Sequence, residues 1–140
     1  MTAPQPILQM NYSQGKAVTD VEIVVFNPIN SRQVSYRKRV QIDTGFDSGV
    51  HIRELDAGEL AMIGITPPRG SVTLAGNVPA QARYCAGYLQ KIGDYSLQPP
   101  GIPITVVFQG TTQQGLLGLE AIRNWFVEFD GPGQSFKITS

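Results

Sequence analysis

Short runs of β-branched and aromatic residues, separated by turn formers, recur along most of this chain. Residues 21–26 and 34–42 are two such runs, and Asn27-Pro28-Ile29-Asn30 lies between them. Runs of this kind on either side of a turn segment are typical of a β-hairpin. The pattern therefore predicts a long hairpin whose second strand ends at Asp43, followed by a short strand over residues 50–52.

The second half of the chain repeats the same alternation of strands and turns. Residues 71–74 and 80–89 predict another hairpin, with Gly76 and Asn77 near its tip because both residue types tolerate a positive φ. Further strands are expected over residues 104–108, 126–129 and 135–139. Residues 115–125 predict an apolar strand that passes through Gly118 into a short helix, and residues 56–63 a short helical turn capped by Asp56.

These elements predict one mostly β domain over residues 1–140, a small closed barrel or sandwich with one or two short helices. Residues 1–17 are expected to form an N-terminal arm. A chain of 140 residues is long enough to build a hydrophobic core without disulfides or metals.

Charge and composition remove several classes of function. The chain has 11 basic and 11 acidic residues, a net charge of +0, so no overall field favours a nucleic acid or an anionic membrane. Charged residues make up only 16%, which fits a subunit that hides surface in an oligomer or a highly β-structured core. The N-terminus lacks the features of a signal peptide and no segment reaches the length of a membrane span, so a soluble, cytoplasmic protein is expected.

Metal and cofactor chemistry finds no support in the residue patterns. Cys85 is the only cysteine and is expected to be a small buried thiol. His51 is the only histidine, outside any zinc-binding spacing, and is expected to be packed or on the surface. No cofactor and no metal are therefore expected.

The candidate chemistry lies at Asp43-Thr44-Gly45-Phe46, where an apolar strand stops on an acidic residue. A carboxylate there is costly to bury without compensation, a threonine can donate a hydrogen bond, and a glycine lets the backbone approach a ligand. This combination can present a carboxylate on a rigid loop. It can also be an ordinary turn that ends a strand, because aspartate and glycine are common in turns.

The order of elements, together with residues 42–46 and the segment Leu116-Leu117-Gly118, resembles the retropepsin-like aspartic proteases, and most closely their bacterial single-domain members with Asp-Thr-Gly-Phe. The resemblance implies a closed barrel of the retropepsin type, with Asp43 as the catalytic carboxylate. It also implies that Thr44 braces the loop across a subunit interface and that Gly45 lines the substrate groove.

The same resemblance implies that residues 71–89 are a flap hairpin over the substrate, with Gly76 and Asn77 near its tip. Phe46, bulkier than the residue at this place in retroviral members, would form the floor of the groove. Asp47 would either be a turn residue or accept hydrogen bonds from the substrate backbone. The chain departs from retroviral members after Gly118, where Leu119-Glu120 replaces an arginine-containing pair.

Aspartic proteolysis uses two carboxylates that share one proton, one activating water and the other protonating the carbonyl oxygen. This chain has only one Asp-Thr-Gly, so the resemblance implies a homodimer in which each subunit contributes Asp43. The expected function is hydrolysis of peptide or protein substrates. Two alternatives stay open: a non-catalytic binding or scaffold module of the same fold, and an unrelated β-barrel in which Asp-Thr-Gly is only a turn.

Overall fold

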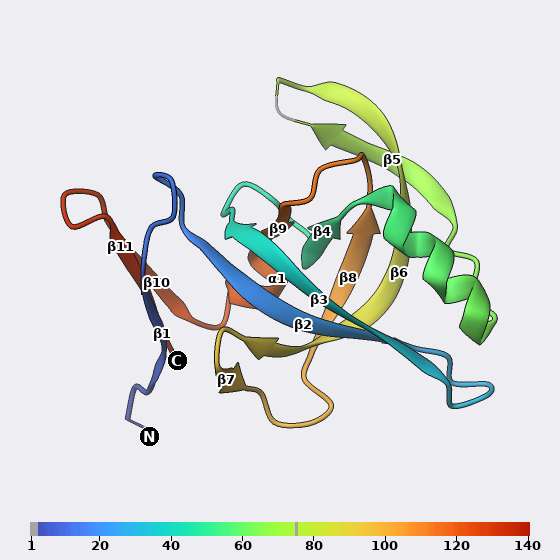
Figure 1. The fold of residues 1–140 in the computed structure, drawn as a ribbon, viewed down its shortest axis with the longest axis horizontal. Helices are drawn as coiled ribbons and strands as arrows, with labels where there is room; N and C mark the ends of the chain where they lie inside the picture. Colours follow the sequence, from blue (N-terminus) through green and yellow to red (C-terminus); the bar gives the residue numbers. More distant parts are fainter. Residues whose placement is uncertain (1–2, 75) are drawn as a thin grey trace.

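The computed structural model describes residues 3–74 and 76–140, and its elements follow the chain in the order shown in Figure 1. In sequence order they are β1 (Pro6–Asn11), β2 (Val18–Phe26), β3 (Gln33–Ile42), β4 (Val50–Ile52), the 3-10 helix η1 (Glu54–Ile63), β5 (Arg69–Leu74), β6 (Val78–Ile92), β7 (Tyr95–Ser96), β8 (Ile102–Phe108), β9 (Gly115–Leu117), α1 (Leu119–Ile122), β10 (Phe126–Asp130) and β11 (Ser135–Thr139).

Six of these strands close into a barrel, in the order β2-β3-β9-β4-β8-β6, and β6 pairs again with β2. The pairs β3–β9 and β4–β8 are parallel, whereas the other barrel pairs are antiparallel. The predicted mostly β fold with a small closed barrel and two short helices is confirmed. The parallel pair β3–β9 brings the end of the first hairpin beside the apolar segment that precedes Gly118.

The interior of the barrel is filled by the apolar residues that alternate along its strands. Ile23, Val40, Leu89 and Phe108 are each fully buried, and Tyr36 packs edge-on against Phe108 with ring centroids 6.1 Å apart. Side chains of this size each stabilise the fold by about 1.5–3 kcal/mol when they leave water. The barrel is therefore a rigid frame for the loops at its ends.

The β5–β6 hairpin projects from this frame, as Figure 1 shows at the top of the view. The register runs from Arg69 opposite Arg83 to Leu74 opposite Val78, and the rest of β6 pairs with β8 and β2 inside the barrel. Strand β6 is thus longer at both ends than the predicted strand over residues 80–89. One continuous strand belongs to both the hairpin and the barrel, so the barrel sets the direction in which the hairpin projects.

A separate three-stranded sheet joins the two ends of the chain, in the order β1-β11-β10. The predicted N-terminal arm lies here, because β1 pairs with β11 from Pro6 to Asn11. Within the described residues, β10 pairs only with β11, so its other edge is open. Phe126 and Phe129 on this edge strand are 69% and 48% exposed.

The prediction that Asp56 caps a helix is wrong. The residue that precedes η1 is Arg53, which makes no side-chain capping bond, and Asp56 lies inside the helix with only 3% of its surface exposed. Its carboxylate lies 2.9 Å from Lys38 Nζ and 3.2 Å from Arg53 Nε. A buried carboxylate needs such partners, because an uncompensated charge is too costly to remove from water.

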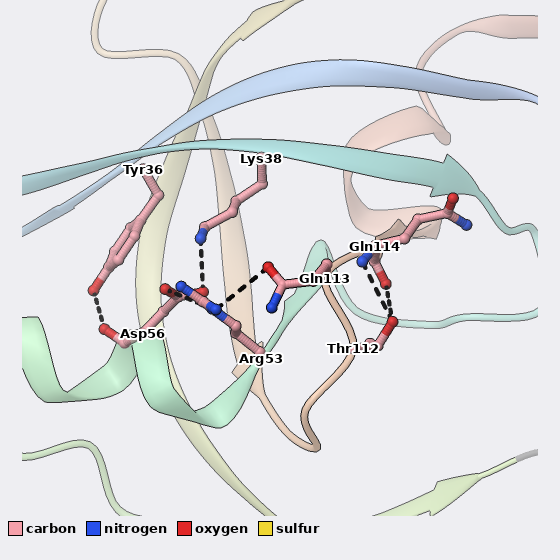
Figure 2. Close-up of polar contacts among 7 residues, drawn as sticks. All are labelled: Tyr36, Lys38, Arg53, Asp56, Thr112, Gln113 and Gln114. Atoms are coloured by element: carbon pink, nitrogen blue, oxygen red, sulfur yellow. Dashed lines mark hydrogen bonds and ion pairs between the residues drawn. The ribbon is translucent and has the colours of Figure 1, made fainter. Parts of the chain in front are cut away.

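Figure 2 shows how the polar contacts around Asp56 connect three segments of the chain. The Tyr36 hydroxyl donates to the Asp56 carbonyl oxygen at 2.8 Å, and Arg53 Nη1 donates to Gln113 Oε1 at 3.3 Å. Burial, and then the charges of nearby acidic groups, raise the pKa of the Tyr36 hydroxyl far above its usual value, so it stays a donor. The network joins β3, η1 and the loop that leads into β9.

Candidate functional site

Asp43 directly follows Ile42, the last residue of β3. Its N–H donates to the carbonyl oxygen of Leu117 at 2.9 Å, which extends the β3–β9 pairing by one residue. Its side chain is half-buried, and Oδ1 accepts the N–H of Gly45 at 2.8 Å. Two packed strands therefore hold the backbone of Asp43, while its carboxylate stays accessible.

The loop after Asp43 rests directly on Gly118. Gly118 N–H donates to Gly49 O and Leu119 N–H donates to Phe46 O, each at 2.8 Å. A Cβ atom at Gly118 would overlap the carbonyl oxygens of Ser48 and Phe46, so no larger residue fits without moving the backbone. This close approach explains why a glycine follows the apolar pair in β9.

Glu120, one of the residues that departs from retroviral members, is occupied in holding the helix α1. Its carboxylate accepts the N–H of Thr105 at 3.0 Å and the Thr105 hydroxyl at 3.3 Å. These bonds fasten α1 to the barrel strand β8. The Asp43 loop is therefore supported through Gly118 and α1 by backbone contacts and a carboxylate, without an arginine.

A groove of about 580 Å³ lies between the Asp43 loop and the β5–β6 hairpin. Six of the seven residues that the sequence singled out line it; the seventh, Thr44, is exposed outside it. The six are Asp43, Gly45, Phe46, Asp47, Gly76 and Asn77. Residues more than thirty positions apart in the sequence thus meet around one opening.

The groove is also lined by five residues that the sequence did not single out as site residues: His51, Leu116 and, within the expected flap hairpin, Val72, Thr73 and Leu74. His51 is half-buried, with Nε2 3.2 Å from Gln109 Oε1 and its ring edge-on to Phe46 at 6.2 Å. Val50 and Ile52 on either side of it are buried in the core. Because neighbouring residues of a strand point to opposite faces, this alternation could have placed His51 on the groove side of β4.

The hairpin side of the groove ends in an exposed turn. Gly76 and Asn77 have φ values of 77° and 59°, the left-handed conformations that the sequence led us to expect there. Leu74 and Val78, paired across the two strands, are 37% and 53% exposed. The hairpin thus presents an apolar pair and a tight turn beside the opening.

The charges along the groove are unbalanced. Asp43 and Asp47 line it, His51 is its other ionisable residue, and no lysine or arginine is among its lining residues. Ion pairs within the described residues involve neither aspartate. The groove therefore offers carboxylates that no basic side chain of the described chain neutralises.

Cys85, on the barrel strand β6, is half-buried rather than fully buried as expected. Burial raises the pKa of its thiol to about 12, so it is a weak nucleophile at neutral pH. Across residues 3–74 and 76–140, no three histidine, cysteine or acidic residues gather as a metal site would need. The helices in the same part of the chain are all too short or too polar to span a membrane.

Comparisons with known proteins found a similarity at the level of the fold. No family model matches the chain, and no curated protein matches it. The chain is similar to the crystal structure of a retropepsin-like aspartic protease from Rickettsia conorii, with 15% sequence identity and a TM-score of 0.44. The similarity covers 89% of this chain and 94% of that one.

Proposed function

We propose that this protein is an aspartic endopeptidase in which two Asp43 carboxylates, one from each subunit of a homodimer, activate water for peptide hydrolysis. The observation that carries the proposal is the groove that Asp43 shares with the turn of the β5–β6 hairpin. The groove has the size of a ligand site. Asp43 lies at one side of it, with its backbone N–H bonded to Leu117 O.

The need for a second subunit follows from the chemistry. One carboxylate takes the proton of the attacking water while a second, protonated one donates to the carbonyl oxygen. Among the described residues that line the groove, Asp47 is the only other carboxylate, and it lies on the same loop without a threonine and glycine after it. A two-fold axis beside Asp43 supplies an identical carboxylate at close range, where the two share one proton.

The open edge of β10 is the surface that we assign to the dimer. Phe126 and Phe129 are exposed on this strand, and cavities of about 480 Å³ and 300 Å³ lie along it. An unpaired strand edge with exposed aromatic side chains favours pairing with another chain. A second copy that adds its own β10 antiparallel to this edge would satisfy the two-fold symmetry.

The surroundings of Thr44 support a role in bracing the dimer. It is exposed, next to Asp43, and within the described residues its hydroxyl makes no hydrogen bond. In the proposed dimer this hydroxyl donates across the two-fold axis to the partner's loop. Thr44→Ala would then weaken association, since a lost buried hydrogen bond costs roughly 1–3 kcal/mol.

The direct test compares the wild type with Asp43→Asn on an unstructured protein substrate. The amide has the same shape but cannot activate water, so we expect cleavage to disappear while the circular dichroism spectrum stays the same. Asp94→Asn, which removes one negative charge from an exposed turn, is the matched control and should cleave like the wild type. Cleavage by Asp43→Asn at a near wild-type rate would refute the assignment.

Dilution tests the shared site separately. Far below the dissociation constant, the dimer population falls with the square of total protein, so activity should fall more steeply than linearly. Excess Asp43→Asn mixed with wild type should suppress cleavage, because a mixed dimer holds one competent carboxylate. A sedimenting monomer with full specific activity would refute the dimeric site and direct attention to Asp47.

The second candidate function is a binding or scaffold module without hydrolysis. The observation that favours it is Leu119-Glu120 after Gly118: the Glu120 carboxylate accepts hydrogen bonds from Thr105, and no basic side chain is among the described residues that line the groove. A protein that dimerises and binds unstructured peptides, yet shows no cleavage that depends on Asp43, would fit this function.

A further inference from the structure

Asp47 is a groove residue whose charge has no partner in the described chain. It lines the groove beside Asp43 and Phe46 and is exposed. Within the described residues it forms no ion pair and its carboxylate accepts no hydrogen bond. It is thus available to a charged group that enters the groove from outside.

None of the protein's basic side chains is among the described residues that line the groove, and several form ion pairs elsewhere. Six of the 11 basic residues form ion pairs, and none of the 11 lines the groove. The six are Arg37, Lys38, Arg53, Arg69, Arg83 and Lys137. The helix α1 packs against the loop through the Leu119 N–H, which donates to Phe46 O. Its one charged residue, Glu120, already accepts a hydrogen bond from Thr105.

We propose that the groove selects peptides that carry a lysine or arginine close to the cleaved bond, with Asp47 as the counter-ion. This inference rests on the proposed peptidase function, which supplies a peptide in the groove. Two Asp47 carboxylates, with an Asp43 pair that shares one proton, give the dimeric groove three negative charges. A basic substrate side chain lowers this repulsion, whereas an acidic one adds to it.

The apolar lining fits the same class of side chain. Phe46, Leu74 and Leu116 line the groove together with the two aspartates. Lysine and arginine bury their methylene stems along apolar surface while the charged head reaches a polar group. A groove with apolar walls and a free carboxylate therefore matches a basic side chain better than an acidic one of similar length.

The test uses one unstructured parent peptide with both ends blocked, so that its termini carry no charge. Lysine, methionine or glutamate replaces the residue at each of the three positions on either side of the cleaved bond. At the preferred position we expect kcat/KM to be about tenfold higher for lysine than for methionine, and lower still for glutamate. The preference should weaken as salt rises from about 0.05 M to about 0.5 M.

Variants of Asp47 assign the preference to its charge. Asp47→Asn should bring the lysine-to-methionine ratio to within about twofold of one, whereas Asp47→Glu should retain it. Asp94→Asn, with the same charge change on an exposed turn, should also retain the wild-type ratio. Equal ratios for wild type and Asp47→Asn would overturn the inference, although cleavage that depends on Asp43 would still support the peptidase.

A binding measurement separates this inference from the proposed hydrolysis. The Asp43→Asn protein, which keeps Asp47, is titrated into the same peptides carrying a fluorescent label, and anisotropy is recorded. Tighter binding of the lysine peptide, lost in Asp43→Asn with Asp47→Asn, would support the charge selection even if the wild type cleaves nothing. Equal binding of the lysine, methionine and glutamate peptides would overturn it.

Discussion

Asp43 and Asp56 are two carboxylates of one chain in opposite surroundings. Asp56 is 3% exposed and lies against Lys38 and Arg53, whereas Asp43 is half-buried and accepts only the N–H of Gly45 among the described residues. Asp56 is held inside by its cations and serves the fold. Asp43 is held by its backbone and by one N–H, with no cation beside it in the described residues, so its side chain remains available for chemistry.

The type of contact distinguishes a structural carboxylate from a candidate reactive one. Ion pairs offset the cost of burying a carboxylate and fix its position, which suits a residue that joins β3 to η1. In the proposed function Asp43 acts with a second carboxylate instead of a cation, and the partner subunit supplies that carboxylate. Substitutions that remove each charge in turn test this contrast between Asp43 and Asp56.

The largest change in stability is expected for Asp56→Asn. It leaves Lys38 and Arg53, 21% and 29% exposed, without a negative partner, and should lower the free energy of unfolding by roughly 3 kcal/mol. Asp43→Asn should change it by less than about 0.5 kcal/mol, because the amide oxygen can still accept the Gly45 N–H. Urea unfolding followed by tryptophan fluorescence measures both values.

Glu22→Gln is the control for the loss of an ordinary ion pair. Glu22 lies 3.9 Å from Arg37, and both side chains are well exposed at 41% and 67%. Such pairs contribute between about zero and 1 kcal/mol, so this variant should stay close to the wild type. If Asp56→Asn lost no more stability than Glu22→Gln, the network in Figure 2 would contribute no more to stability than an exposed ion pair.

A smaller loss is expected from Gly118→Ala, which tests the backbone support of Asp43. The added Cβ would overlap the carbonyl oxygens of Ser48 and Phe46, so the loop must shift at a cost of roughly 2 kcal/mol. Gly58→Ala in η1 is the matched control, since nothing lies within 4 Å of its Cβ position. A Gly118→Ala protein as stable as Gly58→Ala would show that the loop does not depend on this close approach.

Much of the fold could be predicted because local patterns and the barrel agree. The hairpin into Asp43, the turn at Gly76-Asn77 and the strand that passes through Gly118 into a helix each carry a local signal, from β-branched runs or from glycine. The sequence also indicated most of the groove, since six of its residues were expected near the site. These features depend on neighbours in the chain.

The features that were missed depend on contacts between distant segments. Asp56 has the local appearance of a helix cap, and only the packing of β3 against η1 brings Lys38 to it. In the sequence Glu120 looks like an exposed residue of the helix after Gly118, yet its carboxylate accepts the N–H of Thr105 on β8. No local pattern encodes such pairs, because each joins segments that only the fold brings together.

The smallest expected effect concerns pH and the thiol of Cys85 in the barrel wall. Burial raises the pKa of this thiol from 9.0 to about 12, so above pH 9 the unfolded chain releases a proton that the folded chain retains. The stabilisation is therefore fully present below pH 9 and is lost as pH rises towards 12. For a half-buried thiol we expect the free energy of unfolding to fall by roughly 0.5 kcal/mol between about pH 8 and pH 9.5.

Cys85→Ala should remove this part of the pH dependence. The buried Tyr36 hydroxyl, whose pKa is raised in the same direction, should keep its own smaller part. Urea unfolding of both proteins across this range measures the two slopes. If the free energy of unfolding changed equally with pH in the wild type and in Cys85→Ala, the thiol would be as accessible to water as the residues of the groove. The barrel wall would then protect its side chains no better than the Asp43 loop does.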